Sequence, residues 1–200
     1  MKTLYYIHDP MCSWCYAFSD TFNKLINQLP SEINIQYICG GLAPNSDEPM
    51  PINMKESIQS IWHDITIKVG TKFNHDFWTL NTPRRSTYLS CQACVSARVQ
   101  NKEKEMIKEI QKAYYLNAKN PSNEDTLIQC ANNINLDIKK FKNDLYSNEI
   151  LEIFKDDLQK RKDLNIYSFP SLVLQVDNEI HNINIEFNNS NKILENILKY

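Results

Sequence analysis

Two cysteines three residues apart, in the run PMCSWC at residues 10–15, constrain this chain more than any other feature. They follow an apolar run at residues 4–7 and precede a helical pattern that begins near Tyr16. At a helix start, unpaired backbone N–H groups and the positive end of the helix dipole stabilise a thiolate, here at Cys12. Cys15 is close enough to attack a mixed disulfide formed by Cys12. The motif therefore predicts a dithiol that exchanges with disulfides.

The segments around this pair predict a strand–helix–strand unit. Residues 4–8 are apolar enough for a buried strand, and apolar residues at spacings of four, three and four over 18–29 are typical of one helix face. Residues 33–39 alternate with a period of two, which indicates a second strand. A crossover of this length favours parallel strands. The cysteines then lie at the carboxyl end of the first strand, where open sheets tend to place their sites.

The rest of the chain changes character twice. Residues 42–52 are rich in Pro, Asn and Ser and predict a loop, after which about a hundred residues carry helical patterns. One of these helices is predicted to start at residues 81–83, which places Arg84 and Arg85 in its first turn. A β-rich run then returns at 171–176, with a turn and a second strand at 179–186, before a terminal amphipathic helix.

This order predicts an α/β domain interrupted by a helical insertion. Residues 1–45 and 164–200 are assigned to the α/β domain, and residues 46–163 to the insertion. Two hundred residues are enough to bury a core without disulfide staples.

Charge and hydropathy exclude several classes of protein. The net charge of −2 and the absence of a basic block disfavour nucleic acids and anionic membranes as partners. Apolar runs extend for only a few residues, well short of the roughly 20 that a membrane span needs. Residues 1–9 are typical of a strand and not of a signal peptide, so we expect a cytoplasmic protein. Six cysteines in such a protein indicate catalytic or metal chemistry more than a disulfide framework.

The motif DPMCSWC at residues 9–15, the helical insertion and Phe169-Pro170 before the β-hairpin resemble the DsbA branch of the thioredoxin superfamily. The wording of the motif is most similar to the FrnE-like group. The resemblance implies a thioredoxin-like α/β fold with a large all-helical insertion. It also implies that Cys12 is the exposed nucleophile and Cys15 the buried resolving thiol. By the same resemblance, Pro170 is cis and packs against the pair, and the backbone beside it, with Phe169, binds substrate peptide.

The leading hypothesis is therefore a thiol–disulfide oxidoreductase, either a reductase or an isomerase. Its partners are expected to be proteins or small molecules that carry thiols or disulfides. No cofactor is expected beyond the redox-active disulfide, with glutathione as an additional candidate co-substrate. Ser13 and Trp14 lie next to the nucleophile and are expected to contact the substrate. The best-known oxidants of the family carry Pro-His between the cysteines, so the direction of electron flow stays open here.

Two other functions compete with this hypothesis. The kappa-class glutathione transferases and chromene-carboxylate isomerases are similar in architecture, but they usually carry Ser at the position of Cys12 and lack the second cysteine. The intact pair argues against that assignment. The other alternative is a non-enzymatic zinc-binding protein, in which a second pair, Cys91 and Cys94, joins Cys12 and Cys15 in a four-cysteine site. Because Cys91 and Cys94 fall inside a predicted helix, no metal site is the favoured expectation.

Each of the remaining cysteines can have either a structural role in the core or a functional role. Cys91 and Cys94 are either buried filler, which is favoured, or an auxiliary dithiol that exchanges with the first pair. Cys39 and Cys130 are expected to be core residues. His8 ends the first strand, and it either shares a proton with a thiol or simply packs in the sheet, which is slightly favoured.

Overall fold

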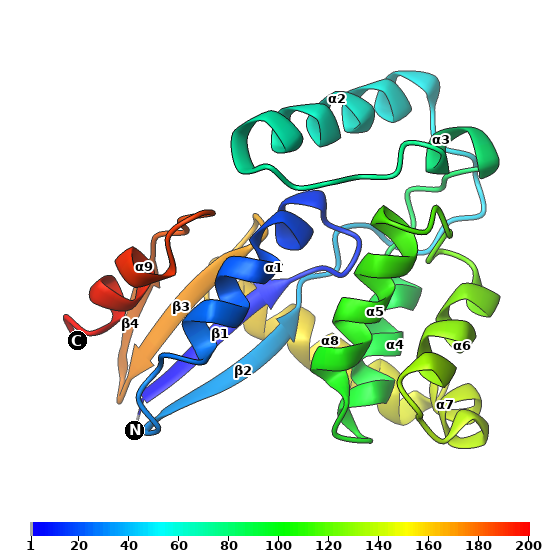
Figure 1. The fold of residues 1–200 in the computed structure, drawn as a ribbon. Coiled ribbons are helices and arrows are strands. Elements are labelled where there is room, and N and C mark those ends of the chain that lie inside the picture. The colour runs from blue at the N-terminus through cyan, green and yellow to red at the C-terminus, as the bar shows by residue number, and fades with distance from the viewer. Residues whose placement is uncertain (1) are drawn as a thin grey trace.

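The computed structural model describes residues 2–200 and is built on one four-stranded mixed sheet (Figure 1). The strand order is β2-β1-β3-β4, with β1 and β2 parallel and both other pairs antiparallel. The strands are β1 (Lys2–His8), β2 (Ile33–Cys39), β3 (Ser171–Val176) and β4 (Glu179–Ile183). The predicted parallel unit and the later hairpin are both confirmed, although β4 ends three residues earlier than predicted.

Helices cover both faces of this sheet. On one face, α1 (Ser13–Ile26) and α9 (Ser190–Ile197) lie side by side (Figure 1), and they bury Phe18, Phe22 and Ile193 against the strands. The residues four and three apart on α1 form its apolar stripe. On the other face, the C-terminal end of α8 packs Leu164 against the sheet. Because both faces are covered, β1 is buried along almost its whole length.

The chain between β2 and β3 is helical, as predicted. Its hub is α4, buried continuously from Leu89 to Ala97, which packs against α5, α6, α7 and α8. The helices are α2 (Ile52–Val69), α3 (Phe77–Leu80), α4 (Tyr88–Arg98), α5 (Glu103–Tyr115), α6 (Glu124–Asn133), α7 (Ile138–Asp144) and α8 (Asn148–Asp163). Within residues 2–200, no helix combines the length and apolar character that crossing a membrane requires.

One helix start was predicted wrongly. The Asn-Thr-Pro signal at residues 81–83 does not begin a helix, because α4 starts only at Tyr88. Within the intervening segment, Arg84 forms an isolated antiparallel bridge with Pro49. Arg84 therefore does not lie in the first turn of a helix, and it contacts the N-cap of α6 instead. Its guanidinium donates to the Ser122 carbonyl and to Asn123 Oδ1, both at 2.7 Å, so it ties two loops of the helical region together.

Candidate active site

Cys12 and Cys15 lie at the start of α1, after the short loop that follows β1. Cys12 is the N-cap of α1, in an extended conformation, and its carbonyl accepts the first helical bond from Tyr16 N at 3.0 Å. This leaves the Cys12 side chain at the helix start, where unpaired N–H groups gather. Cys12 is 8% exposed, and Cys15, one turn further along, is completely buried. The two positions thus differ in access to a substrate.

The pair also differs in acidity. A hydrogen bond from the Cys15 thiol, helped by backbone N–H groups of Cys15 and Trp14, lowers the pKa of Cys12 despite its burial. Burial raises the pKa of Cys15 well above its ordinary value, and the contact with Cys12 adds to that. The arrangement therefore favours a thiolate at Cys12 and a protonated thiol at Cys15. This is the charge distribution that a nucleophile and a resolving thiol require.

This difference predicts a pH dependence for alkylation. Iodoacetamide reacts with the thiolate, so lowering the pKa keeps Cys12 reactive at lower pH. In the reduced protein, the Cys12 rate should reach half its maximum below about 8.5, the value of free cysteine. Cys15→Ala removes the hydrogen bond from the neighbouring thiol and should move that midpoint upward, whereas Cys130→Ala should not. Mass-spectrometric rates against pH measure this, and an identical midpoint with and without Cys15 would contradict it.

Phe169 and Pro170, which are distant from Cys12 in the sequence, lie next to it in the fold. The peptide bond between them is cis, and the Phe169 carbonyl lies 3.5 Å from Cys12 Sγ, which donates to it when protonated. Pro170 is buried, and Phe169 is half-buried. A backbone carbonyl next to a reactive sulfur is suited to hold an extended peptide beside that sulfur.

The Phe169 ring depends on a glycine at the end of β2. A Cβ at Gly40 would lie 2.3 Å from Cζ of Phe169, so Gly40→Ala must displace the Phe169 ring, whose backbone carbonyl lies beside Cys12. We expect insulin reduction to slow on the order of ten- to a hundredfold, since small misplacements at a reacting centre are costly. Gly70→Ala is the matched control, because nothing lies within 4 Å of its Cβ and only its positive φ is strained. Equal rates for the two variants in an insulin-reduction assay would contradict this prediction.

Ser13 and Trp14 were expected to contact substrate, and each of them contacts an aromatic side chain. Ser13 Oγ accepts a hydrogen bond from Trp62 Nε1 at 2.9 Å. Trp62 is fully buried on α2, so this bond fastens the helical region to the start of α1. The Trp14 ring packs against Phe187 with a centroid distance of 5.0 Å and is half-buried. Ser13 therefore has a structural partner, and Trp14 keeps a partly open surface beside Cys12.

Asp9 organises the loop before the cysteines, a role that its place in the motif did not reveal. Its carboxylate is fully buried and accepts from Met11 N at 2.8 Å and Leu42 N at 2.7 Å. It also accepts from Thr87 Oγ1 at 2.7 Å, just before α4. Burial raises the pKa of Asp9, and these hydrogen bonds oppose that rise. One side chain thus joins the Cys12 loop, the segment after β2 and the start of α4.

A second group of cysteines lies deeper, where the end of β2 meets α4. Cys39, Cys91 and Cys94 are all completely buried. Hydrogen bonds from the Cys91 and Cys94 thiols lower the pKa of Cys39 well below its ordinary value. Cys91 Sγ also approaches Asp9 Oδ2 at 3.5 Å. The structure therefore directs both α4 thiols toward Cys39. The remaining thiol, Cys130, lies on α6 in the same apolar cluster.

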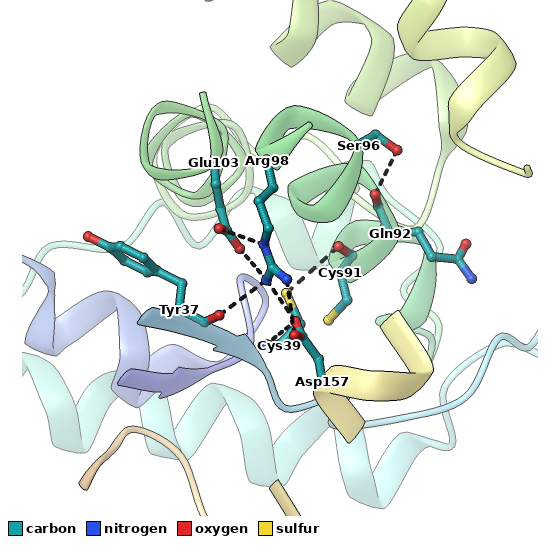
Figure 2. Close-up of polar contacts among 8 residues, drawn as sticks. All are labelled: Tyr37, Cys39, Cys91, Gln92, Ser96, Arg98, Glu103 and Asp157. Carbon is teal, nitrogen blue, oxygen red and sulfur yellow. Dashed lines mark hydrogen bonds and ion pairs between the residues drawn. The ribbon is translucent and has the colours of Figure 1, made fainter. Parts of the chain in front are cut away.

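An ion-pair network surrounds Cys39 (Figure 2). Arg98 pairs with Glu103 at 2.6 Å and with Asp157 at 2.7 Å, and Asp157 Oδ2 accepts from Cys39 N at 2.9 Å. Burial raises the pKa of Glu103 to about 7, against the pull of Arg98. Arg98 also donates to the Tyr37 carbonyl at 3.2 Å, so the network connects α4, α5 and α8 to the edge strand β2.

The four-cysteine zinc site considered from the sequence is wrong in its geometry. Within the part of the chain that the structure describes, the one group of three or more metal-type donors within 4.8 Å of each other is His8, Cys39 and Glu103. Cys12 and Cys15 do not belong to it. The two CxxC pairs are separated by the Asp9 carboxylate, which faces the Cys12 loop on one side and Cys91 on the other.

Comparison with known proteins shows the family. A family model described as thioredoxin matches residues 5–196, nearly the whole chain. The ClpXP adapter protein SpxH of Halalkalibacterium halodurans is 28% identical over 181 residues, covering 88% of this chain and 59% of that protein. The chain thus spans about three fifths of the length of this curated relative.

Two solved structures share the fold throughout. A candidate protein disulfide isomerase from Nitrosomonas europaea superposes with a TM-score of 0.86 at 21% identity, covering 99% of this chain and 98% of that one. The cytosolic disulfide reductase DsbM from Pseudomonas aeruginosa, solved with GSH, gives a TM-score of 0.81 at 17% identity, covering 99% and 100%. These likenesses establish a DsbA-like arrangement of a sheet with a helical insertion.

Proposed function

Because the chain belongs to the thioredoxin family, we propose that it is a thiol–disulfide oxidoreductase, working as a reductase or isomerase through Cys12 and Cys15. The observation that carries the proposal is the division between the two sulfurs. Cys12 is the more exposed and has the lowered pKa, whereas Cys15 is buried and has the raised one. A pair of equivalent thiols would give no such order of attack.

The reaction follows from that division. The Cys12 thiolate attacks one sulfur of a substrate disulfide, which forms a mixed disulfide and releases the other substrate sulfur as a thiolate. Cys15 then loses its proton and displaces the remaining substrate thiolate, leaving a Cys12–Cys15 disulfide. The substrate is reduced by two electrons and the pair is oxidised by two. Two molecules of a small thiol, for which we propose glutathione, restore the dithiol and leave as their disulfide.

The test is insulin reduction with glutathione as the reductant, combined with trapping. Wild-type protein should accelerate the reduction of insulin disulfides above the rate with glutathione alone. Cys15→Ser should accumulate a mixed disulfide at Cys12, visible as a mass increase that dithiothreitol removes. If the wild type reduces no disulfide and Cys15→Ser traps no partner, the proposal fails. Conjugation of glutathione to an electrophile that survives Cys15→Ser would instead support the transferase alternative.

The names of the curated relatives suggest a second role, as a protein-binding adapter. We propose this only as a separable activity, because the chain spans 56–59% of the length of those two relatives. Adapter function depends on a surface and redox function on a sulfur. A protein partner that binds Cys12→Ser as tightly as wild type would therefore support the adapter role without bearing on the redox one.

A further inference from the structure

The ends of β1 and β2 and the facing sides of α4 and α5 enclose a cluster of metal-type ligands that the redox proposal does not use. It consists of His8, Cys39, Cys94 and Glu103. The first three are completely buried, and the Glu103 side chain is 11% exposed. A histidine and a glutamate are seldom buried in a core without partners.

His8 gives the most direct indication. Neither of its ring nitrogens has a hydrogen-bond partner of suitable distance and angle, although the residue is completely buried. An unsatisfied buried polar group destabilises the folded state, so native proteins generally provide it with a partner. The ring is also held in place, stacked on Tyr6 with centroids 5.1 Å apart and edge-on to Tyr37 at 6.0 Å. The Cys39 thiol is its polar neighbour, and a fixed imidazole beside a thiol is suited to bind a metal ion together with it.

The other donors are arranged around this ring. One donor atom each from His8, Cys39 and Glu103 lies within 4.8 Å of both others. With Zn–N, Zn–S and Zn–O bonds of about 2.0–2.3 Å, tetrahedral ligands lie about 3.3–3.8 Å apart. The donors therefore need to close by at most about 1.5 Å. The Cys94 thiol is hydrogen-bonded to Cys39. Its sulfur lies outside the group of three donors that are all within 4.8 Å of one another, so it has to turn toward the ion to supply the fourth ligand.

The surroundings orient these ligands in the way that metal sites usually require. Arg98 donates to both oxygens of Glu103, from Nε at 2.8 Å and from Nη2 at 2.6 Å. Each carboxylate oxygen keeps a free lone pair. The Cys39 backbone N–H is fixed by Asp157, itself bound by Arg98 at 2.7 Å and 3.0 Å. Figure 2 shows Arg98 and Glu103 on their helices with both Cys39 and Asp157 close by.

We propose that His8, Cys39, Cys94 and Glu103 bind one zinc-class divalent ion, in a closed site distinct from the Cys12–Cys15 pair. Four protein ligands leave no open position, which is the pattern of a structural site and not of a catalytic one. The ion would join β1 and β2 to α4 and α5, and so stabilise the junction between the sheet and the helical region. This proposal does not depend on the proposed redox function.

The test uses the full chain with the redox pair removed, as Cys12→Ser/Cys15→Ser, reduced and freed of metal. Titration with Co²⁺ should give about one bound ion per chain, with thiolate-to-cobalt charge transfer and tetrahedral d–d absorption. Zn²⁺ should displace it. At a hundredfold excess over its dissociation constant, Zn²⁺ should raise the melting temperature by about 5–10 °C.

Further substitutions in that background locate the site. Cys39→Ser should abolish the charge-transfer band and the rise in melting temperature, and Cys130→Ser, a buried thiol outside the cluster, should leave both intact. His8→Gln should change the d–d spectrum, and it serves if Cys39→Ser does not fold. The proposal is overturned if the reduced parent takes up no Co²⁺. It is also overturned if Cys39→Ser and His8→Gln bind the ion as the parent does.

Discussion

Cys12→Ser should lower the rate of insulin reduction by at least about a thousandfold, to the level of glutathione alone. The reason is that a serine hydroxyl is not ionised near neutral pH and cannot form the mixed disulfide, and nucleophile removal costs enzymes factors of this size. Cys15 cannot substitute, since it is completely buried and burial raises its pKa well above the ordinary value. The measurement is the initial rate of insulin precipitation in glutathione, with the uncatalysed rate subtracted.

A matched control separates this effect from general thiol loss. Cys130→Ser removes another buried sulfur, on α6 and outside the Cys12–Cys15 pair, and should keep the wild-type rate. A Cys12→Ser variant that retained more than about a tenth of the wild-type rate would show that the nucleophile lies elsewhere.

Trp62→Ala should lower the free energy of unfolding by about 3–5 kcal/mol, the range for deleting a large buried aromatic side chain. Trp62 is completely buried on α2 and packs against Phe73, Trp78 and Tyr115, with ring centroids 4.8–5.4 Å apart. Its removal leaves a cavity between α2 and the rest of the molecule. Urea unfolding followed by circular dichroism measures the loss.

Two companion variants show how that energy is divided. Trp62→Phe keeps most of the packing but removes the hydrogen bond to Ser13, so about 1–2 kcal/mol should be lost. Ile61→Ala, at the neighbouring and partly exposed position, should lose less than about 1 kcal/mol. If Trp62→Ala were no more destabilising than Ile61→Ala, α2 would not be anchored through this ring.

Local periodicity was sufficient to predict the sheet and its main covering helix. The alternation over residues 33–39 and the apolar spacing over 18–29 each reflect one face buried by a neighbour, and burial of a face is visible in the sequence. The start of α4 was not predictable in this way. Its true start is set by Thr87, whose hydroxyl is engaged by Asp9 from a distant part of the chain. The proline at residue 83 carries no information about the contact between Thr87 and Asp9.

The candidate site was predictable to a similar degree. The spacing of Cys12 and Cys15 and their place after a strand were local facts, and the resemblance supplied Pro170 and Phe169. By contrast, Asp9 and Trp62 act through partners 78 and 49 residues away in sequence. Cys39 was predicted to be a core residue, and it is indeed buried. Its proximity to His8 and to the α4 thiols arises only when β1, β2 and α4 meet.

The unequal burial of the six sulfurs has a practical consequence for any study of what this protein touches in a cell. Five of them have at most 2% of their surface exposed, and Cys12, at 8%, is the most exposed of the six. A thiol-directed label, spin probe or affinity handle should therefore attach at one defined point without removal of the other cysteines. Disulfide-linked species recovered from an extract should likewise carry a single junction, and the partner's own cysteine can be assigned directly from the cross-linked peptide.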